Sequence, residues 1–354
     1  MMNIDTPYYE DLFRISNSNI GWFLNKGPAF LHKMLTDPPP EEKNSTLERG
    51  TMIHEYILQP EEFQKDYVVW DKSRPSSAQQ EKFCQELANS LEIEPNKALL
   101  SAYRNAYSTS GKTEEKMLSE ASKIASTLKE YIDFLKSDDK RKMISPWDAK
   151  MLNIIRTNMI EHKMAQQIVW PVIWDNDKQN VGKDGTRCYH EFHINWEYLA
   201  PYGSNAEQDE NPQGVYGIKC KSLLDGLTLD FKNNKAIIYD LKTTQKLWHF
   251  EDSMNMYDYC RQLAYYTMAV IWYLEEECGV YDAENTWTFE YYIIGIDTTG
   301  SNDVRVFHID SKNVHERDDT IDEAMKDIAW HQMNDKWDHT RAYYEGDGSE
   351  TLNL

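Results

Sequence analysis

The periodicity of apolar residues changes near residue 168, and this change limits the fold more than any other feature of the chain. Before it, apolar residues such as Leu118, Ala121 and Ile124 recur at three- and four-residue steps, which predicts helices. After it, segments rich in β-branched and aromatic residues alternate with period two, which predicts strands. The predicted strands span 189–198, 219–231, 236–244, 287–297 and 304–310. The chain is therefore expected to place a helical first half before one β-sheet.

The connections between these strands give the order of the predicted elements. The polar segment 201–214 is expected to be a loop, and 231–236 is short enough to form a hairpin in which Asn233 and Asn234 take positive φ. A helix is expected from about Asp252 to Cys278, where Gly279 ends it. The resulting order is helices, β, β, β, α, β, β and a helical tail. This order predicts an α/β fold with a mixed sheet flanked by helices.

Three regions follow from this order. Residues 1–167 form a helical N-terminal region, residues 168–310 form the core sheet, and residues 311–354 form a helical tail. In the first region, Ser145 and Asp148 surround Pro146 in the pattern of a helix start. At 354 residues the chain can bury a large core, and we expect the three regions to form one compact domain.

Composition excludes several classes of protein. No apolar run approaches the roughly 18 residues of a membrane span, and the first residues lack the pattern of a signal peptide, so we expect a cytoplasmic protein without a membrane partner. The 5 cysteines form no C-x-x-C pair, which argues against zinc ribbons and disulfide frameworks. The net charge is −21, from 38 basic and 59 acidic residues. A nucleic acid would therefore have to be drawn by local basic residues and bound metal.

Charged residues occupy the end of the most strand-like segment, IIYDLKTT. Asp240 and Lys242 project to the same side of this strand, and Asp225 on the hairpin partner can lie beside Asp240. Two converging carboxylates repel unless a cation lies between them, and such a pair suits Mg²⁺ or Mn²⁺. The lysine can then orient the attacking water or offset developing charge. The arrangement predicts metal-dependent phosphodiester hydrolysis, although a lone D-x-K is more often an ordinary exposed strand end.

Four more segments accompany IIYDLKTT in a fixed order. They are GTMIHEYIL with His54, YHEFHINW with Glu191, KCKSLLDGL with Asp225, and CRQLAYYTMAV with Gln262 and Tyr266. Together the five segments resemble the motifs of the PD-(D/E)xK nuclease superfamily, in its RecB-like and RecE-like phage exonuclease branch. The resemblance implies a restriction-endonuclease-like core of the lambda-exonuclease type. It extends over nearly the whole chain, with 60–165 matched only as helices.

The resemblance also implies roles for individual residues. The expected metal ligands are His54, Glu191, Asp225, Asp240 and Leu241. The expected catalytic residues are Asp225, Asp240, Lys242, Glu191 and Gln262. The expected substrate-binding residues are Tyr266, Ser16, Ser18, Lys221 and Thr243. The implied metal is Mg²⁺, for which Mn²⁺ can substitute. Some relatives carry a four-cysteine iron–sulfur cluster, but only Cys278 follows the Q-x-x-x-Y segment here, so no cluster is expected.

Each of these residues also has a purely structural interpretation. A lone histidine such as His54 is usually a satisfied core residue, and a glutamate such as Glu191 is common on a half-exposed strand. Gln262 and Tyr266 lie one helical turn apart and could simply pack their helix on the sheet.

The resemblance implies an exonuclease acting 5′ to 3′ on the ends of duplex DNA. Such an enzyme would supply single strand to an annealing or recombinase partner, as in phage recombination and DNA processing, and a trimeric ring is one possible assembly. Two alternatives remain open at this stage. One is a structure-specific or single-strand endonuclease with the same site. The other is a catalytically idle nuclease fold that binds proteins or mimics DNA, which the net charge of −21 makes conceivable.

Overall fold

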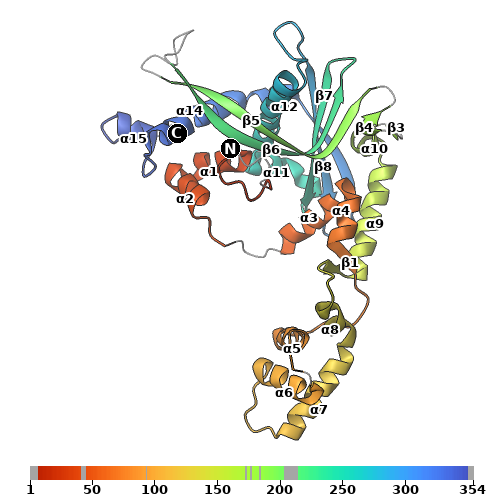
Figure 1. Ribbon diagram of the computed structural model, residues 1–354. Coiled ribbons are helices and arrows are strands. Elements are labelled where there is room, and N and C mark those ends of the chain that lie inside the picture. Colours follow the sequence, from red (N-terminus) through yellow and green to blue (C-terminus); the bar gives the residue numbers. More distant parts are fainter. Residues whose placement is uncertain are drawn as a thin grey trace. The chain divides into compact units, whose positions relative to one another are not determined.

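The computed structural model describes residues 7–40, 45–92, 94–171, 174–175, 178–182, 185–202 and 214–349. The chain divides into two compact units, one of residues 1–59 and 154–354 and the other of residues 60–153 (Figure 1). This division differs from the regions expected from the sequence, which kept 1–167 together. Helical periodicity shows where helices form, but it does not show which core each helix packs on. Most of the expected loop 201–214 lies outside the described residues.

The unit of residues 60–153 is mainly helical. Its helices are α4 (Pro60–Asp66), α5 (Ala78–Ala88), α6 (Pro95–Ala106), α7 (Glu114–Thr127) and α8 (Lys129–Lys136). Two short strands, β1 (Tyr67–Val69) and β2 (Lys142–Ile144), pair in parallel. Phe83, Tyr103 and Ala121 are buried in the core between the helices. The apolar spacing that suggested one long helix over 118–135 belongs to α7 and α8, which meet at Leu128.

The boundary at residue 153 falls within α9 (Pro146–Glu161), whose start the sequence predicted. The Ser145 hydroxyl accepts a hydrogen bond from the Asp148 backbone N–H at 3.0 Å and donates one to the Asp148 carboxylate at 2.6 Å. The two side chains therefore satisfy polar groups at the exposed end of the helix, as the S-P-x-D pattern indicated.

The other unit is built on a seven-stranded mixed sheet of order β3-β4-β5-β6-β7-β8-β9. The strands are β3 (Trp174–Asp175), β4 (Lys178–Gly182), β5 (Arg187–Tyr202), β6 (Gly214–Asp230), β7 (Lys235–Thr244), β8 (Thr288–Asp297) and β9 (Val304–Ile309). All neighbouring strands are antiparallel except β7 and β8, which are parallel. The structure confirms the predicted fold class, a mixed α/β sheet flanked by helices.

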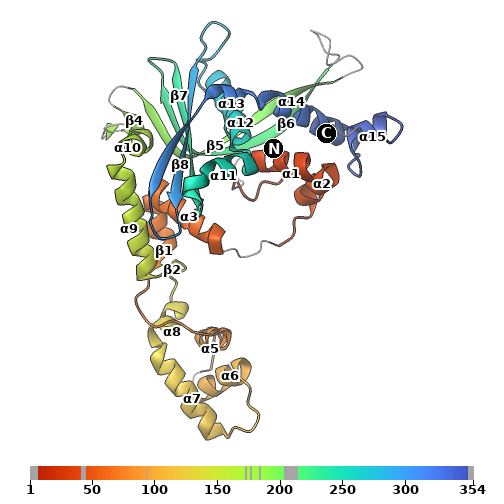
Figure 2. The same ribbon diagram turned by 180° about the vertical axis from the view of Figure 1, so that it is seen from behind.

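Helices precede, interrupt and follow this sheet. They are α1 (Asn17–Lys26), α2 (Pro28–Thr36), α3 (Ser45–Leu58), α10 (Lys163–Val169), α11 (Phe250–Tyr257), α12 (Tyr259–Trp272), α13 (Ser311–His315), α14 (Asp318–Asn334) and α15 (Arg341–Glu345), with the short turns η1 (Leu247–His249) and η2 (Tyr273–Glu277). The helices α12 and α14 contact β5 and β6, and α3 contacts β7 (Figures 1 and 2). No helix in the described ranges is long and apolar enough to cross a membrane.

The predicted strands and hairpin agree with the structure to within a few residues, whereas the helix expected over 252–278 is divided. Of the two hairpin asparagines expected to take positive φ, Asn234 does so with φ 48°, whereas Asn233 does not. Asp258 also has a left-handed backbone, with φ 47°, and this residue separates α11 from α12. No glycine or proline marks the break, so the apolar periodicity alone could not show it.

Gly226 on β6 leaves room for the ring of Tyr239 on the neighbouring strand β7. The two residues are paired in the β6–β7 ladder, and a Cβ at Gly226 would lie 1.9 Å from Cζ of that ring. Tyr239 is only 1% exposed and cannot move aside. We expect Gly226→Ala to lower the free energy of unfolding by about 1–3 kcal/mol, measured by urea denaturation.

The same cost should fall sharply in a Tyr239→Ala background, because the ring that causes the clash is gone. If Gly226→Ala costs equal amounts with and without the Tyr239 ring, this packing explanation is wrong.

Candidate metal centre

One open cavity of about 600 Å³ in the sheet-containing unit collects most of the residues predicted to be functional. Those lining it are Ser18, His54, Glu191, Asp225, Asp240, Leu241, Lys242, Thr243, Gln262 and Tyr266. They come from α1, α3, β5, β6, β7 and α12, which are far apart along the chain. The fold therefore brings the sequence motifs together at one place.

The register of the sheet aligns three carboxylates across adjacent strands. Gly226 pairs with Tyr239, and continuing that register by one residue places Asp225 opposite Asp240. On the other side of β6, the pairs on either side of Glu191 place this residue opposite Asp225. Glu191 has φ 48°, a left-handed backbone that is rare for a residue with a side chain and recurs at functional sites.

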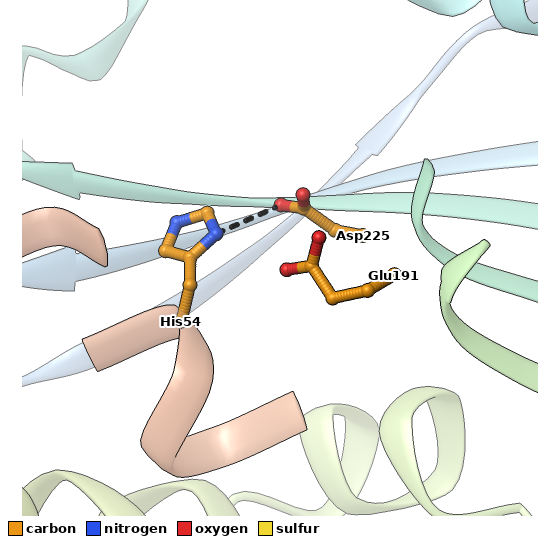
Figure 3. A group of neighbouring side chains, drawn as sticks. All are labelled: His54, Glu191 and Asp225. Carbon is orange, nitrogen blue, oxygen red and sulfur yellow. Dashed lines mark ion pairs between the residues drawn. The ribbon is translucent and has the colours of Figure 1, made fainter. Parts of the chain in front are cut away.

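His54 completes a group of possible metal ligands with two of these carboxylates. The ligand atoms of His54, Glu191 and Asp225 all lie within 4.8 Å of one another. Figure 3 shows the imidazole of α3 facing the carboxylates of the two neighbouring strands. The His54 Nδ1 atom lies 3.5 Å from Oδ2 of Asp225, and that same oxygen accepts a hydrogen bond from the Leu241 N–H at 2.6 Å. The backbone of β7 thus fixes the Asp225 carboxylate.

Asp240 lies beside this group, at the centre of a series of polar side-chain contacts. Its Oδ2 atom is 2.6 Å from Nζ of Lys242, and its Oδ1 atom accepts a hydrogen bond from Gln262 Nε2 at 2.8 Å. Gln262 also donates to the Tyr266 hydroxyl at 2.8 Å, and the Lys242 ammonium lies 4.8 Å from the centre of the Tyr259 ring. These contacts hold Lys242 and Gln262 at the edge of the carboxylate group.

The electrostatics of the cavity show an excess of negative charge. Burial and the neighbouring Asp225 and Asp240 raise the pKa of Glu191 to about 8. Burial and Asp225 raise the pKa of Asp240 to about 6, against the lowering effect of Lys242. Burial would lower the pKa of Lys242, but the carboxylates of Asp240 and Asp225 outweigh it and raise that pKa. A cation among these groups would therefore be strongly stabilised.

The raised pKa of Glu191 predicts that the metal-free protein loses stability as the pH rises. The unfolded chain releases this proton near pH 4.3, whereas the folded protein holds it to about pH 8. Between these values the folded state binds more protons, so stability falls with increasing pH, by a few kcal/mol over the whole window. We expect thermal melts in EDTA to show this fall, with a smaller slope in Glu191→Gln. Equal slopes for the two proteins would contradict the assignment.

Two of the predicted substrate-binding residues are engaged elsewhere. Lys221 is 6% exposed, and its ammonium donates to the carbonyl oxygens of Tyr8 and Asp11 at 2.5 Å each. The Ser16 hydroxyl donates to Asn19 and caps α1. In the described part of the chain, neither residue is among those lining the cavity.

Other lining residues were missed by the sequence analysis. The most prominent are four tyrosines: Tyr8, Tyr9, Tyr257 and Tyr259. Two sequence features could have identified them: the pair YY near the chain start, and the sequence YDY at the start of the helix that carries the Q-x-x-x-Y motif.

The donor set fits a divalent cation. Carboxylate oxygens are the ligands that Mg²⁺ and Mn²⁺ prefer, and one imidazole is compatible with Mn²⁺. Burial is the main cause of the raised pKa of Glu191, and the charges of Asp225 and Asp240 add to it; a bound cation relieves this repulsion between carboxylates. Three of the predicted side-chain ligands form the group directly. Asp240 lies beside them: its Oδ1 atom accepts a hydrogen bond from Gln262, and its buried Oδ2 atom has the Lys242 ammonium at 2.6 Å but no hydrogen-bond partner among the described residues.

Comparisons with known proteins find a likeness to solved structures. No family model matches the chain, and no curated protein matches it. Among solved structures, the chain is similar to a candidate exonuclease from Eubacterium rectale, with 11% identity and a TM-score of 0.45, over 100% of this chain and 96% of that one. The function therefore has to be argued from the site itself.

Proposed function

We propose that the protein is a metal-dependent nuclease that hydrolyses phosphodiester bonds in DNA. The observation that supports this proposal best is the convergence of His54, Glu191 and Asp225 with the adjacent Asp240–Lys242 pair in one open cavity. Carboxylates and an imidazole can hold a metal ion that assists phosphodiester hydrolysis, and a neighbouring lysine can offset the charge that develops on the phosphate.

The chain's own residues have distinct tasks in this proposal. His54, Glu191 and Asp225 would hold Mg²⁺ or Mn²⁺, with Asp240 and the Leu241 carbonyl as further ligands. A bound Mg²⁺ supplies a Lewis acid for the phosphate oxygens and lowers the pKa of a water. Lys242, held by Asp240, donates to the attacking water or to the phosphate and offsets its developing charge.

Gln262 keeps Asp240 in place through its hydrogen bond at 2.8 Å. Thr243 and Tyr266 line the cavity next to these groups, where they can contact the substrate strand.

We further propose that the enzyme is an exonuclease. The resemblance of the five motifs supports this choice, and it also supports 5′ to 3′ polarity, duplex ends as substrate, and a single-strand annealing or recombinase partner. An endonuclease with the same site remains the second candidate. An assay that compares linear with covalently closed circular DNA separates the two. A catalytically idle fold is disfavoured, because Asp225, Asp240 and Lys242 are all present and lie together.

The test uses end-labelled linear duplex and covalently closed circular DNA, each with Mg²⁺ and with EDTA. Mg²⁺-dependent loss of the linear DNA alone, absent in Asp240→Asn, is the expected result. Label at the 5′ or the 3′ end then gives the polarity. Nicking of the circle would favour the endonuclease. No cleavage of either DNA with Mg²⁺ or Mn²⁺ would contradict the proposed function.

A further inference from the structure

Tyrosine rings surround the cavity that holds the candidate metal centre. Tyr8 and Tyr9 lie on one segment of its lining, and Tyr257 and Tyr259 lie on another. Tyr9 is 81% exposed and Tyr257 is 57% exposed, although large aromatic side chains are usually buried. Aromatic rings that are exposed beside a reactive centre suggest a ligand with flat faces.

The segment carrying Tyr8 and Tyr9 is anchored firmly to the sheet. The Lys221 ammonium binds the carbonyl oxygens of Tyr8 and Asp11 and lies 4.5 Å from the centre of the Tyr8 ring. Ile15 then forms a parallel bridge with β6, and its carbonyl accepts a hydrogen bond from Tyr265 at 2.6 Å. Tyr9 packs edge-to-face on Tyr8 at 5.2 Å. The first pair of rings is therefore held at the cavity by buried contacts.

The second pair of rings is presented by the unusual turn between α11 and α12. Asp258, between Tyr257 and Tyr259, has a left-handed backbone with φ 47°, and its carboxylate accepts a hydrogen bond from Arg317 Nε at 2.8 Å. The two rings are stacked, with their centres 5.7 Å apart. A left-handed backbone at a residue other than glycine costs energy and persists only where the surroundings hold it. The surrounding contacts therefore hold this turn in place, and the turn places two tyrosine rings at the rim of the cavity.

The charges of the cavity limit how a nucleic acid can be held there. Among the described residues that line it, Lys242 is the only lysine or arginine, and this side chain is already paired with Asp240. A binding mode based on phosphate contacts needs several free cations. Stacking of bases on aromatic rings needs none, and it acts on every base because each has a flat face. In an intact duplex neighbouring bases cover these faces, except for the outer face of each terminal pair. Successive bases can therefore stack on two separate rings only when their nucleotides are unpaired.

We propose that this cavity binds the unpaired terminal nucleotides of a DNA strand, with bases stacked on Tyr9 and Tyr257, so that the strand reaches the metal centre as single strand. This inference rests on the proposed nuclease function and adds the form of its substrate. A duplex end must fray before its terminal nucleotides enter. Overhangs and mismatched ends are therefore better substrates than blunt ends closed by G·C pairs.

The test measures binding in EDTA, where a metal-dependent enzyme cannot cleave. The probes are two duplexes with 2-aminopurine at the terminal position, one with a single-stranded overhang and one blunt and closed by G·C pairs. We expect the overhang to bind more tightly and its 2-aminopurine fluorescence to be quenched.

Tyr9→Leu and Tyr257→Leu should each weaken binding of the overhang by about 5- to 100-fold, while Tyr9→Phe and Tyr257→Phe retain it. Tyr202→Leu, which removes a tyrosine that is 43% exposed and outside the cavity lining, is the matched control and should have no effect.

Equal binding of the two duplexes would overturn the inference, as would leucine variants that bind the overhang like the wild type. A parallel arm with Mg²⁺ measures cleavage of the same probes. If the wild type binds the overhang as expected but cleaves nothing with Mg²⁺ or Mn²⁺, the proposed function fails while the inference about binding stands. If it cleaves both probes at equal rates and the leucine variants do the same, the function stands and the inference fails.

Discussion

Asp225→Asn should lose DNA cleavage by roughly 10³-fold or more and yet make the metal-free protein more stable at pH 8. The activity falls because Asp225 is the carboxylate shared by the metal group and the Leu241 backbone, and loss of a metal ligand removes several kcal/mol of transition-state stabilisation. The stability rises because one of the charges that raise the pKa of Glu191 and Asp240 is gone. The gain should be of the order of 1 kcal/mol.

Asparagine keeps an oxygen that can accept the Leu241 hydrogen bond, so the substitution removes charge with little change of shape. The measurements are single-turnover cleavage with Mg²⁺ and urea denaturation in EDTA. Because most substitutions destabilise a protein, a rise in stability together with a loss of activity is a specific signature. A less stable Asp225→Asn protein would show that the carboxylates do not repel one another in the metal-free state.

Lys242→Met should also lose cleavage, by about 10²- to 10⁴-fold, but with the opposite effect on stability. The Lys242 side chain is 20% exposed, and its partner Asp240 is 1% exposed. Removing the ammonium leaves a buried carboxylate without its counter-charge. We expect a loss of up to about 3 kcal/mol at pH 8, reduced at lower pH where Asp240 takes up a proton.

The control for this prediction is Lys242→Arg, which keeps the charge and should retain most of the stability. Arginine is a poorer proton donor and a different shape, so its cleavage should stay well below that of the wild type. A stable and active Lys242→Met protein would remove lysine from the mechanism.

The sequence was sufficient to predict the five strands β5 to β9, because apolar and polar residues alternate along them and turn residues bound them. It did not predict the short strands β3 and β4. The segment IIYDLKTT lies within β7, the hairpin residue Asn234 has positive φ, and the Ser145–Asp148 pattern begins α9. These features depend on residues close together along the chain. The pairing of Asp225 with Asp240 was also predictable, because a short hairpin fixes the register of its two strands.

The remaining features depend on contacts between distant residues. Nothing near Glu191 in the sequence indicates its left-handed backbone, and nothing near Asp258 indicates the break between α11 and α12. Lys221 was expected to bind substrate, because its actual partners are carbonyl oxygens some 210 residues away along the chain. The tyrosines of the cavity were missed for the same reason, since only the fold brings the two segments that carry them to one site.

The most direct test of the metal centre is a crystal structure of the protein soaked in Mn²⁺, with anomalous scattering data collected at the manganese edge. We expect an anomalous peak bounded by His54, Glu191 and Asp225, on the side of Asp240, and no such peak in crystals of Asp225→Asn. A wild-type crystal with no peak among these side chains, or with its manganese bound only elsewhere, would contradict the proposed site.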